Sequence, residues 1–199
     1  KEVADVSPLV RGNINDMVVD AQGRAYIGSF GYDPMGGEEA KTANIVLVTP
    51  EGQVSVAADD LGFPNGTVIS PDGKTMIVAE TFANCLSAFC IADDGTLFDR
   101  RMFAQLGEAT PDGICLDAEG AVWVSSFVTG EFIRVKDGGE VTQRIPVPNK
   151  RAVACMLGGE GRHTLFMLTA ATTVEELAKG NSAAFIETVQ VEVPGAGLP

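Results

Sequence analysis

The chain has 199 residues, enough for one well-cored domain, and its hydrophobic fraction of 45% and charged fraction of 21% are ordinary for a globular protein. The formal net charge of -13, from 14 basic and 27 acidic residues, argues against nucleic acid and anionic lipid surfaces as partners. No apolar run reaches the length that crosses a bilayer, so no membrane association is predicted.

The cysteines and the first residues of the chain give a prediction of the cellular compartment. The cysteines Cys85, Cys90, Cys115 and Cys155 each lie in an apolar, strand-like run, and none forms a CxxC pair. This pattern favours reduced, buried thiols and a cytoplasmic location over a disulfide framework. No signal peptide is recognisable, but the sequence begins with Lys rather than Met, so a leader that has already been lost stays an alternative.

The predicted elements are β-hairpins that recur along the chain. Each has a short apolar strand, a turn centred on glycine and a second apolar strand, as in "NDMVVDAQGRAYIGSF". Spacings of 50, 47 and 41 residues separate the successive turn glycines. The hairpins span 15–30, 63–81, 112–127 and 153–170, and their turn glycines are Gly23, Gly73, Gly120 and Gly161.

A second set of hairpins fills the intervals between the first set. Their turns, "PEGQ", "DDGT" and "KDGG", lie at 50–53, 93–96 and 136–139. Two hairpins in each period of 41 to 50 residues make a four-stranded unit, which is typical of a β-propeller blade. One short helix is predicted at 173–180, with Thr173 as N-cap, Glu176 three residues later and Gly180 at its end.

One position recurs eight residues before every turn glycine. It holds Asn15, Asn65, Asp112 and Val153, so three of four repeats place an oxygen-bearing side chain just before the innermost strand. For any one of these residues an ordinary turn or strand-entry role would be preferred. Three of them in one register predict a ring around the central channel, and a hard divalent cation is the natural partner for such oxygens.

Other chemistries lack the residues they need. No GxSxG motif occurs, and the single histidine, His163, lies beside the fourth turn and is interpreted as an exposed turn residue. Trp123 alternates with valines and is interpreted as core or inter-blade packing. The "DAQG", "DAEG" and "DDGT" segments lack the EF-hand pattern, so they are interpreted as hairpin turns.

The repeats also carry a family likeness. "NDMVVDAQGRAYIGSF", "PNGTVISPDGKTMIVAET" and "PDGICLDAEGAVWVSSF" resemble successive blades of the SMP-30/gluconolactonase/regucalcin family, and the closing "VPGAGLP" is similar to its bacterial members. The likeness covers nearly the whole chain. It implies an all-β, six-bladed propeller that holds one divalent metal ion in its channel and hydrolyses sugar lactones. Ca²⁺ is the expected ion, with Zn²⁺, Mg²⁺ and Mn²⁺ as alternatives.

The same resemblance implies roles for individual residues. Asn65 and Asp112 match the metal-binding asparagine and aspartate of the family, and Asp112 also matches its proposed general base. Asn15 matches a substrate-contacting asparagine. Asn13 stands where the family has a substrate-contacting arginine, and Asp33 lies near the position of an acidic substrate contact. These departures concern substrate identity more than the metal site.

A larger departure lies at the N-terminus. About one and a half blades and the glutamate that supplies the third metal ligand of the family have no counterpart, so residues 1–199 are expected to form one propeller domain with about four blades. Such an open wedge would expose strand edges that favour self-association. A fragment, completion by another chain and a different ring closure are the alternatives. Glu108 could replace the missing ligand, but a solvent-facing loop role is preferred.

The resulting hypothesis is a metal-dependent hydrolase of sugar lactones. The cation would polarise the lactone carbonyl, and Asp112 would accept a proton from the attacking water. Asn13, Asn15 and Asp33 would orient the substrate. Two rivals stay open: hydrolysis of phosphotriesters or aryl esters on the same metal, and a propeller that binds calcium or a partner without catalysis.

Overall fold

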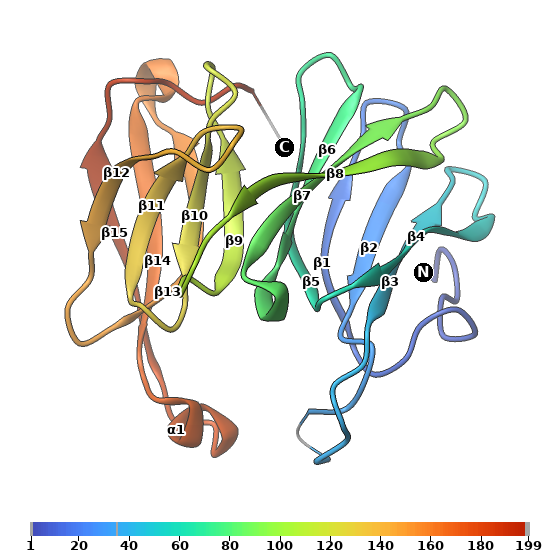
Figure 1. The fold of residues 1–199 in the computed structure, drawn as a ribbon, viewed down its shortest axis with the longest axis horizontal. Helices are drawn as coiled ribbons and strands as arrows, with labels where there is room; N and C mark the ends of the chain where they lie inside the picture. Colours follow the sequence, from blue (N-terminus) through green and yellow to red (C-terminus); the bar gives the residue numbers. More distant parts are fainter. Residues whose placement is uncertain (1, 35, 198–199) are drawn as a thin grey trace.

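The computed structural model describes residues 2–34 and 36–197, which form an all-β fold of four antiparallel sheets (Figure 1). In every sheet the strands are neighbours in chain order. The first sheet contains β1 (Ile14–Val19), β2 (Ala25–Ser29), β3 (Ala43–Val48) and β4 (Val54–Leu61). The second contains β5 (Pro64–Ile69), β6 (Thr75–Glu80), β7 (Cys85–Ile91) and β8 (Leu97–Gln105).

The remaining two sheets follow the same plan. The third contains β9 (Pro111–Leu116), β10 (Val122–Ser126), β11 (Glu131–Val135) and β12 (Val141–Pro146). The fourth contains β13 (Arg151–Gly158), β14 (Thr164–Ala171) and β15 (Ala183–Gln190). Two 3-10 turns, η1 (Thr81–Ala83) and η2 (Glu160–Arg162), and one helix, α1 (Val174–Ala178), complete the described elements.

The predicted hairpins and their turns are confirmed throughout. The fourth sheet differs from the four-stranded expectation because its described part has three strands, with α1 between the second and third. The predicted N-cap is also confirmed, since the Thr173 side chain accepts a hydrogen bond from the Glu176 N–H at 3.1 Å. Gly180 ends this segment with a φ of 76°, a conformation that glycine adopts without strain.

The first strand of each sheet lies beside the first strand of the next. Strand β5 contacts both β1 and β9, and β9 in turn contacts β13. The four sheets are therefore arranged as propeller blades around a common axis lined by β1, β5, β9 and β13, as the repeat predicts. The described residues form four blades, and the complete six-bladed ring stays a prediction.

The core is divided into three clusters, one between each pair of neighbouring sheets. Tyr26 and Phe89 fill the first interface, Phe103 and Ile133 the second, and Trp123 the third. Trp123 is almost completely buried, which confirms its assignment to inter-blade packing. All four cysteines are free thiols; three are buried, whereas Cys90 is only half-buried.

The outer faces of the first and last sheets lack such a partner among the described residues. Side chains that alternate with the core positions are exposed there: Met17 and Val19 on β1, and Ile186 on β15. An uncovered apolar face of this kind is what the open-wedge prediction requires, and self-association through it stays a prediction. No helix within the described residues is both long enough and apolar enough to span a membrane.

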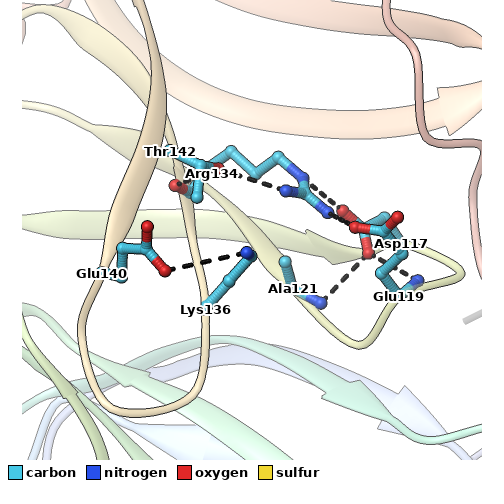
Figure 2. Close-up of polar contacts among 7 residues, drawn as sticks. All are labelled: Asp117, Glu119, Ala121, Arg134, Lys136, Glu140 and Thr142. Carbon is cyan, nitrogen blue, oxygen red and sulfur yellow. Dashed lines mark hydrogen bonds and ion pairs between the residues drawn. The ribbon is translucent and has the colours of Figure 1, made fainter.

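The turns that end β1 and β9 are held by buried aspartates. Figure 2 shows the third blade, in which the Asp117 side chain is completely buried. Its Oδ1 accepts the backbone N–H groups of Glu119 at 2.9 Å and Ala121 at 3.0 Å. Its Oδ2 accepts Arg134 Nε at 2.6 Å, and Arg134 also pairs with Glu119 Oε2 at 2.9 Å. Every oxygen of this buried carboxylate has a donor.

The first blade repeats this arrangement at the equivalent turn. Asp20 Oδ1 accepts the backbone N–H groups of Gln22 and Arg24, each at 2.9 Å. The Arg24 guanidinium donates through Nε to Asp20 Oδ2 at 2.6 Å and through a terminal nitrogen to the Asp93 carbonyl at 2.7 Å. The "DAQG" and "DAEG" segments are therefore hairpin turns, as predicted, in which the aspartate has a structural role.

Candidate active site on the propeller axis

The recurring position coincides with a β-bulge in every first strand. In β1, Ile14 pairs with Ser29 of β2, and Met17 pairs with Ile27. An advance of three residues along β1 is therefore matched by an advance of two along β2, so β1 carries one extra residue. A bulge bends the strand and changes the direction of its side chains. The other bulges lie at 64–67 in β5, 111–114 in β9 and 152–154 in β13.

The residue after the recurring position is glycine in the second and third blades, and the structure explains why. A Cβ on Gly66 would lie 2.6 Å from the Ile114 nitrogen, and a Cβ on Gly113 would lie 2.7 Å from the Ala154 Cα. Neither distance is compatible with a side chain. The Asn–Gly and Asp–Gly pairs are therefore not turns here; their glycines let neighbouring first strands approach closely around the axis.

Asn65 is fixed between the second and third blades. Its side chain is buried, and its Nδ2 donates to Thr81 Oγ1 at 3.2 Å. The Thr81 hydroxyl in turn donates to the Pro111 carbonyl at 2.7 Å, directly before Asp112. This bridge connects the start of β5 to the start of β9 and sets the orientation of the Asn65 amide.

Asp112 is half-buried and faces Asn65. Burial is the main cause that raises the pKa of its carboxyl to about 7, and the negative charge of Asp16 adds to the effect. Hydrogen bonds from the Asn65 side chain and the Gly113 N–H act in the opposite direction. No lysine or arginine among the described residues forms an ion pair with Asp112, in contrast to Asp117. The surroundings of Asp112 therefore favour the protonated carboxyl more than water does.

Asp16 is a further candidate site residue because its charge acts on Asp112, and the sequence analysis did not identify it. It occupies, within the β1 bulge, the place that glycine holds in the second and third blades, and it follows the predicted residue Asn15 directly. Part of its surface is open to solvent, yet neighbouring protein atoms desolvate the carboxyl and raise its pKa. The sequence offered one signal for Asp16, namely that it directly follows Asn15. It lies seven rather than eight residues before the turn glycine, so the search for a recurring position did not find it.

The predicted substrate residues lie at the same end of the blades as Asn65. Asn15 Nδ2 donates to the Pro64 carbonyl at 3.1 Å, which ties the first blade to the second. Asn13 is exposed, and its carbonyl accepts the Phe30 N–H. Asp33 lies exposed in the connection between β2 and β3, where its carboxylate accepts the Gly36 N–H at 2.8 Å.

Two further assignments can be compared with the structure. Glu108 is exposed in the connection before β9, in agreement with the preferred loop interpretation. His163 is half-buried rather than exposed, and its Nδ1 lies 3.0 Å from the Val191 carbonyl.

The donor chemistry around the axis suits a hard cation. The described residues contain no cluster of three or more His, Cys, Asp or Glu side chains that could hold a metal ion, so amide oxygens would have to supply part of the ligand set. Asn15 and Asn65 each use the amide nitrogen for a protein acceptor, which leaves the amide oxygen for another contact. Together with the Asp112 and Asp16 carboxylates these are oxygen ligands of the kind that calcium prefers.

Comparison with known proteins places the chain in a family. A family model described as SMP-30/Gluconolactonase/LRE-like region matches residues 2–171. The chain belongs to this family. The match includes the first three blades and most of the described part of the fourth, and with them every residue of the candidate site.

Curated members of this SMP-30 family match at modest identity. A 6-deoxy-6-sulfogluconolactonase of Pseudomonas putida is 28% identical over 190 residues, which cover 93% of this chain and 64% of that protein. Regucalcin of Danio rerio is 28% identical, over 89% of this chain and 61% of its own length. The chain thus spans less than two thirds of the length of these relatives.

Solved SMP-30 structures have the same blade arrangement. Regucalcin from Agrobacterium tumefaciens, titled a calcium-binding protein, superposes with a TM-score of 0.77 at 24% identity, over 97% of this chain and 66% of that chain. A gluconolactonase from Xanthomonas campestris gives a TM-score of 0.63 at 27% identity, over 77% of this chain and 53% of that chain. The shared fold agrees with the family assignment.

Proposed function

We propose that this chain carries the catalytic residues of a hydrolase that opens sugar lactones. Relatives named 6-deoxy-6-sulfogluconolactonase and pentonolactonase, and a solved gluconolactonase, support this reaction class. The observation that carries the proposal is the position of Asp112, a half-buried carboxyl on the propeller axis that faces Asn65 and lies beside the Asp16 carboxylate. A general base must lie within hydrogen-bond reach of the proton that it abstracts.

Asp112 would act in both steps of the hydrolysis, the attack of water and the departure of the ring oxygen. Its carboxylate accepts a proton from water while the water oxygen bonds to the lactone carbonyl carbon. The ring C–O bond then breaks, its electron pair stays on the ring oxygen, and that oxygen takes the proton back from Asp112. The net change is the addition of one water molecule to give a hydroxy acid. Asn65 supports the ionised form, because its side chain is hydrogen-bonded to the Asp112 carboxyl.

The oxygen-rich donor set fits one divalent cation, and Ca²⁺ is the first choice because a family member is titled a calcium-binding protein. Asn65 and Asp112 would hold it, with the Asp16 carboxylate and the Asn15 amide oxygen as further donors. When bound, such an ion polarises a carbonyl oxygen and stabilises the negative charge that develops there. Zn²⁺, Mg²⁺ and Mn²⁺ are the alternatives to compare.

Asn13, Asn15 and Asp33 are proposed to orient the substrate. All three belong to the first blade or its connection between β2 and β3, at the end where Asn65 and Asp112 begin their strands. Exposed amide and carboxylate groups can pair with sugar hydroxyls, and the choice among lactones would depend on these contacts.

The test compares Asp112→Asn with a matched surface variant, Asp137→Asn. Acid release from D-glucono-1,5-lactone is followed by pH-stat titration above the spontaneous rate, with Ca²⁺ or with EDTA, alongside a phosphotriester and an aryl ester. We expect Asp112→Asn to lose on the order of 10²–10⁴-fold in kcat/KM, the usual contribution of a general base. Asp137, an exposed partner of Arg101, should be dispensable.

Three results would contradict the proposal. Lactone turnover unchanged in Asp112→Asn would remove Asp112 from the mechanism. Turnover of the phosphotriester or aryl ester in preference to every lactone would assign the site to that other chemistry. Calcium binding without turnover of any of these substrates would support a non-catalytic propeller instead.

A further inference from the structure

An aromatic cluster lies immediately beside the candidate catalytic residues. Phe30 and Phe63 stack with ring centroids 4.5 Å apart, and Phe63 contacts Phe82 at 4.7 Å. Tyr32 lies edge-on to Phe63 at 6.3 Å and tilted against Phe82 at 6.5 Å. Tyr32 is buried and Phe30 and Phe63 are half-buried, whereas Phe82 is 57% exposed. The cluster therefore presents one aromatic ring, backed by three others, to solvent.

Chain connectivity places this ring at the site. Phe82 directly follows Thr81, whose hydroxyl joins Asn65 to the Pro111 carbonyl. Phe63 lies two residues before Asn65, and its carbonyl accepts the Thr81 N–H at 3.1 Å. The aromatic cluster and the candidate catalytic residues are thus connected both through the backbone and through a shared hydrogen-bonded threonine.

The segment that carries Phe63 is held in a costly conformation. Phe63 has a φ of 64°, which is rare for a bulky side chain. Buried Glu80 holds the segment by accepting the Gly62 N–H at 2.6 Å, and Arg100 pairs with Glu80 at 2.7 Å. Arg100 also donates to the Asp60 carbonyl at 2.9 Å. Such locally unfavourable backbone persists where the surroundings enforce it, and it is concentrated at ligand sites.

The loops around the cluster are apolar in composition. They read "FGY" at 30–32, "GFP" at 62–64 and "TFA" at 81–83, with no charged side chain in any of the three segments. A substrate hydroxyl placed against these rings would lose water without gaining a partner, which is unfavourable. A hydrocarbon group placed there would be stabilised by removal from water. The ring surface therefore suits an apolar group.

We propose that Phe82, backed by Phe30, Phe63 and Tyr32, binds an apolar arm on the substrate, so that the site accepts lactones with an alkyl substituent in addition to sugar lactones. This inference rests on the proposed lactone hydrolysis at Asp112. It assigns Phe82 to substrate selection, while bond breaking stays with Asp112.

The test measures selectivity for the arm rather than activity alone. The readout is the ratio of kcat/KM for a 6-pentyl-δ-lactone to that for unsubstituted δ-valerolactone. We expect a ratio of about ten or more in the wild type, because most of the pentyl group would leave water. In Phe82→Ala this ratio should fall at least fivefold. The matched control is Phe98→Ala, a similarly exposed phenylalanine on β8, in which the ratio should be unchanged.

A non-hydrolysable ligand separates this inference from the proposed reaction. Calorimetry would compare the affinities of 6-pentyl-piperidin-2-one, a δ-lactam with the same arm, and unsubstituted piperidin-2-one. A preference for the pentyl lactam that depends on Phe82 supports the arm site even if no lactone is hydrolysed, in which case only the hydrolysis proposal fails. The deciding quantity is the preference for the pentyl compound, as a ratio of kcat/KM values for the lactones or of affinities for the lactams. A ratio near one in the wild type, or a ratio unaffected by Phe82→Ala, overturns the inference in either assay.

Discussion

The two ends of the first strands use aspartate in opposite ways. At the turn end of β9, Asp117 is completely buried and its carboxylate has an arginine and two backbone N–H groups as donors. At the other end of the same strand, Asp112 is half-buried beside a second carboxylate, Asp16, and its pKa is raised to about 7. Only four residues lie between the two aspartates in sequence.

The difference shows that the partners of a carboxylate, rather than its burial alone, decide its role. The charge of Asp117 is compensated by Arg134 and by two backbone N–H groups. The charge of Asp112 is opposed by burial and by Asp16 and is only partly offset by hydrogen bonds. Groups of this kind are concentrated at functional sites, which makes Asp112 the stronger candidate of the two aspartates.

The largest effect is expected when the guanidinium group of Arg134 is removed from the turn at the end of β9. Arg134→Ala leaves Asp117 as a buried carboxylate without its counter-ion, so the free energy of unfolding should fall by about 3–5 kcal/mol. Urea denaturation at pH 7 measures this loss. Arg101→Ala removes an exposed ion pair with Asp137 and should cost less than about 1 kcal/mol. Equal losses in the two variants would show that burial of the pair has no special importance.

A smaller effect is expected when a side chain is introduced where β9 and β13 approach each other closely, beside the candidate site. Gly113→Ala introduces a Cβ at 2.7 Å from the Ala154 Cα and should lower the free energy of unfolding by about 1–3 kcal/mol through overpacking. The β9 bulge would shift, so lactone turnover should fall as well. Gly73→Ala is the control, because nothing lies within 4 Å of its added Cβ although its φ is positive. It should cost stability without loss of turnover; loss of turnover in both would contradict this account.

The smallest effect concerns the hydrogen bond between the two proposed metal ligands. Asn65→Ala removes a donor that favours the ionised Asp112, so the Asp112 pKa should rise from about 7 by on the order of one unit. NMR titration of the labelled carboxyl in the presence of EDTA measures the shift. Asn44→Ala, whose amide donates to the Leu9 carbonyl, is the control. An unchanged or lower Asp112 pKa in Asn65→Ala would refute the proposed contact.

The sequence was sufficient for features that repeat along the chain. Turn glycines at a nearly regular interval predicted the hairpins. A fixed offset from them selected Asn65 and Asp112 as candidates, and the two side chains interact in the structure. Both inferences use positions relative to a local turn. Local turn chemistry is encoded by neighbouring residues, so it can be recognised without knowledge of the partner strand.

Features that depend on pairing between strands were not predictable. The bulges at Asn65 and Asp112 appear only when the register of each first strand with its neighbour is known. Gly66 was open to interpretation as a turn residue because its contact, the start of β9, is distant in sequence. Asp16 was missed for the same reason: its position one residue out of register gains meaning only from its proximity to Asp112.

The contrast between Asp112 and Asp117 is tested most directly by the pH dependence of stability in EDTA. The Asp112 pKa rises from 3.8 to about 7 on folding, so the folded state holds more protons and its stability should fall between about pH 4 and pH 7. Asp112→Asn should therefore be more stable than the wild type at pH 8, by about 1–3 kcal/mol, and nearly equal to it at pH 4, whereas Asp117→Asn should be less stable than the wild type at pH 8. An Asp112→Asn variant that is no more stable than the wild type at pH 8 would contradict the account.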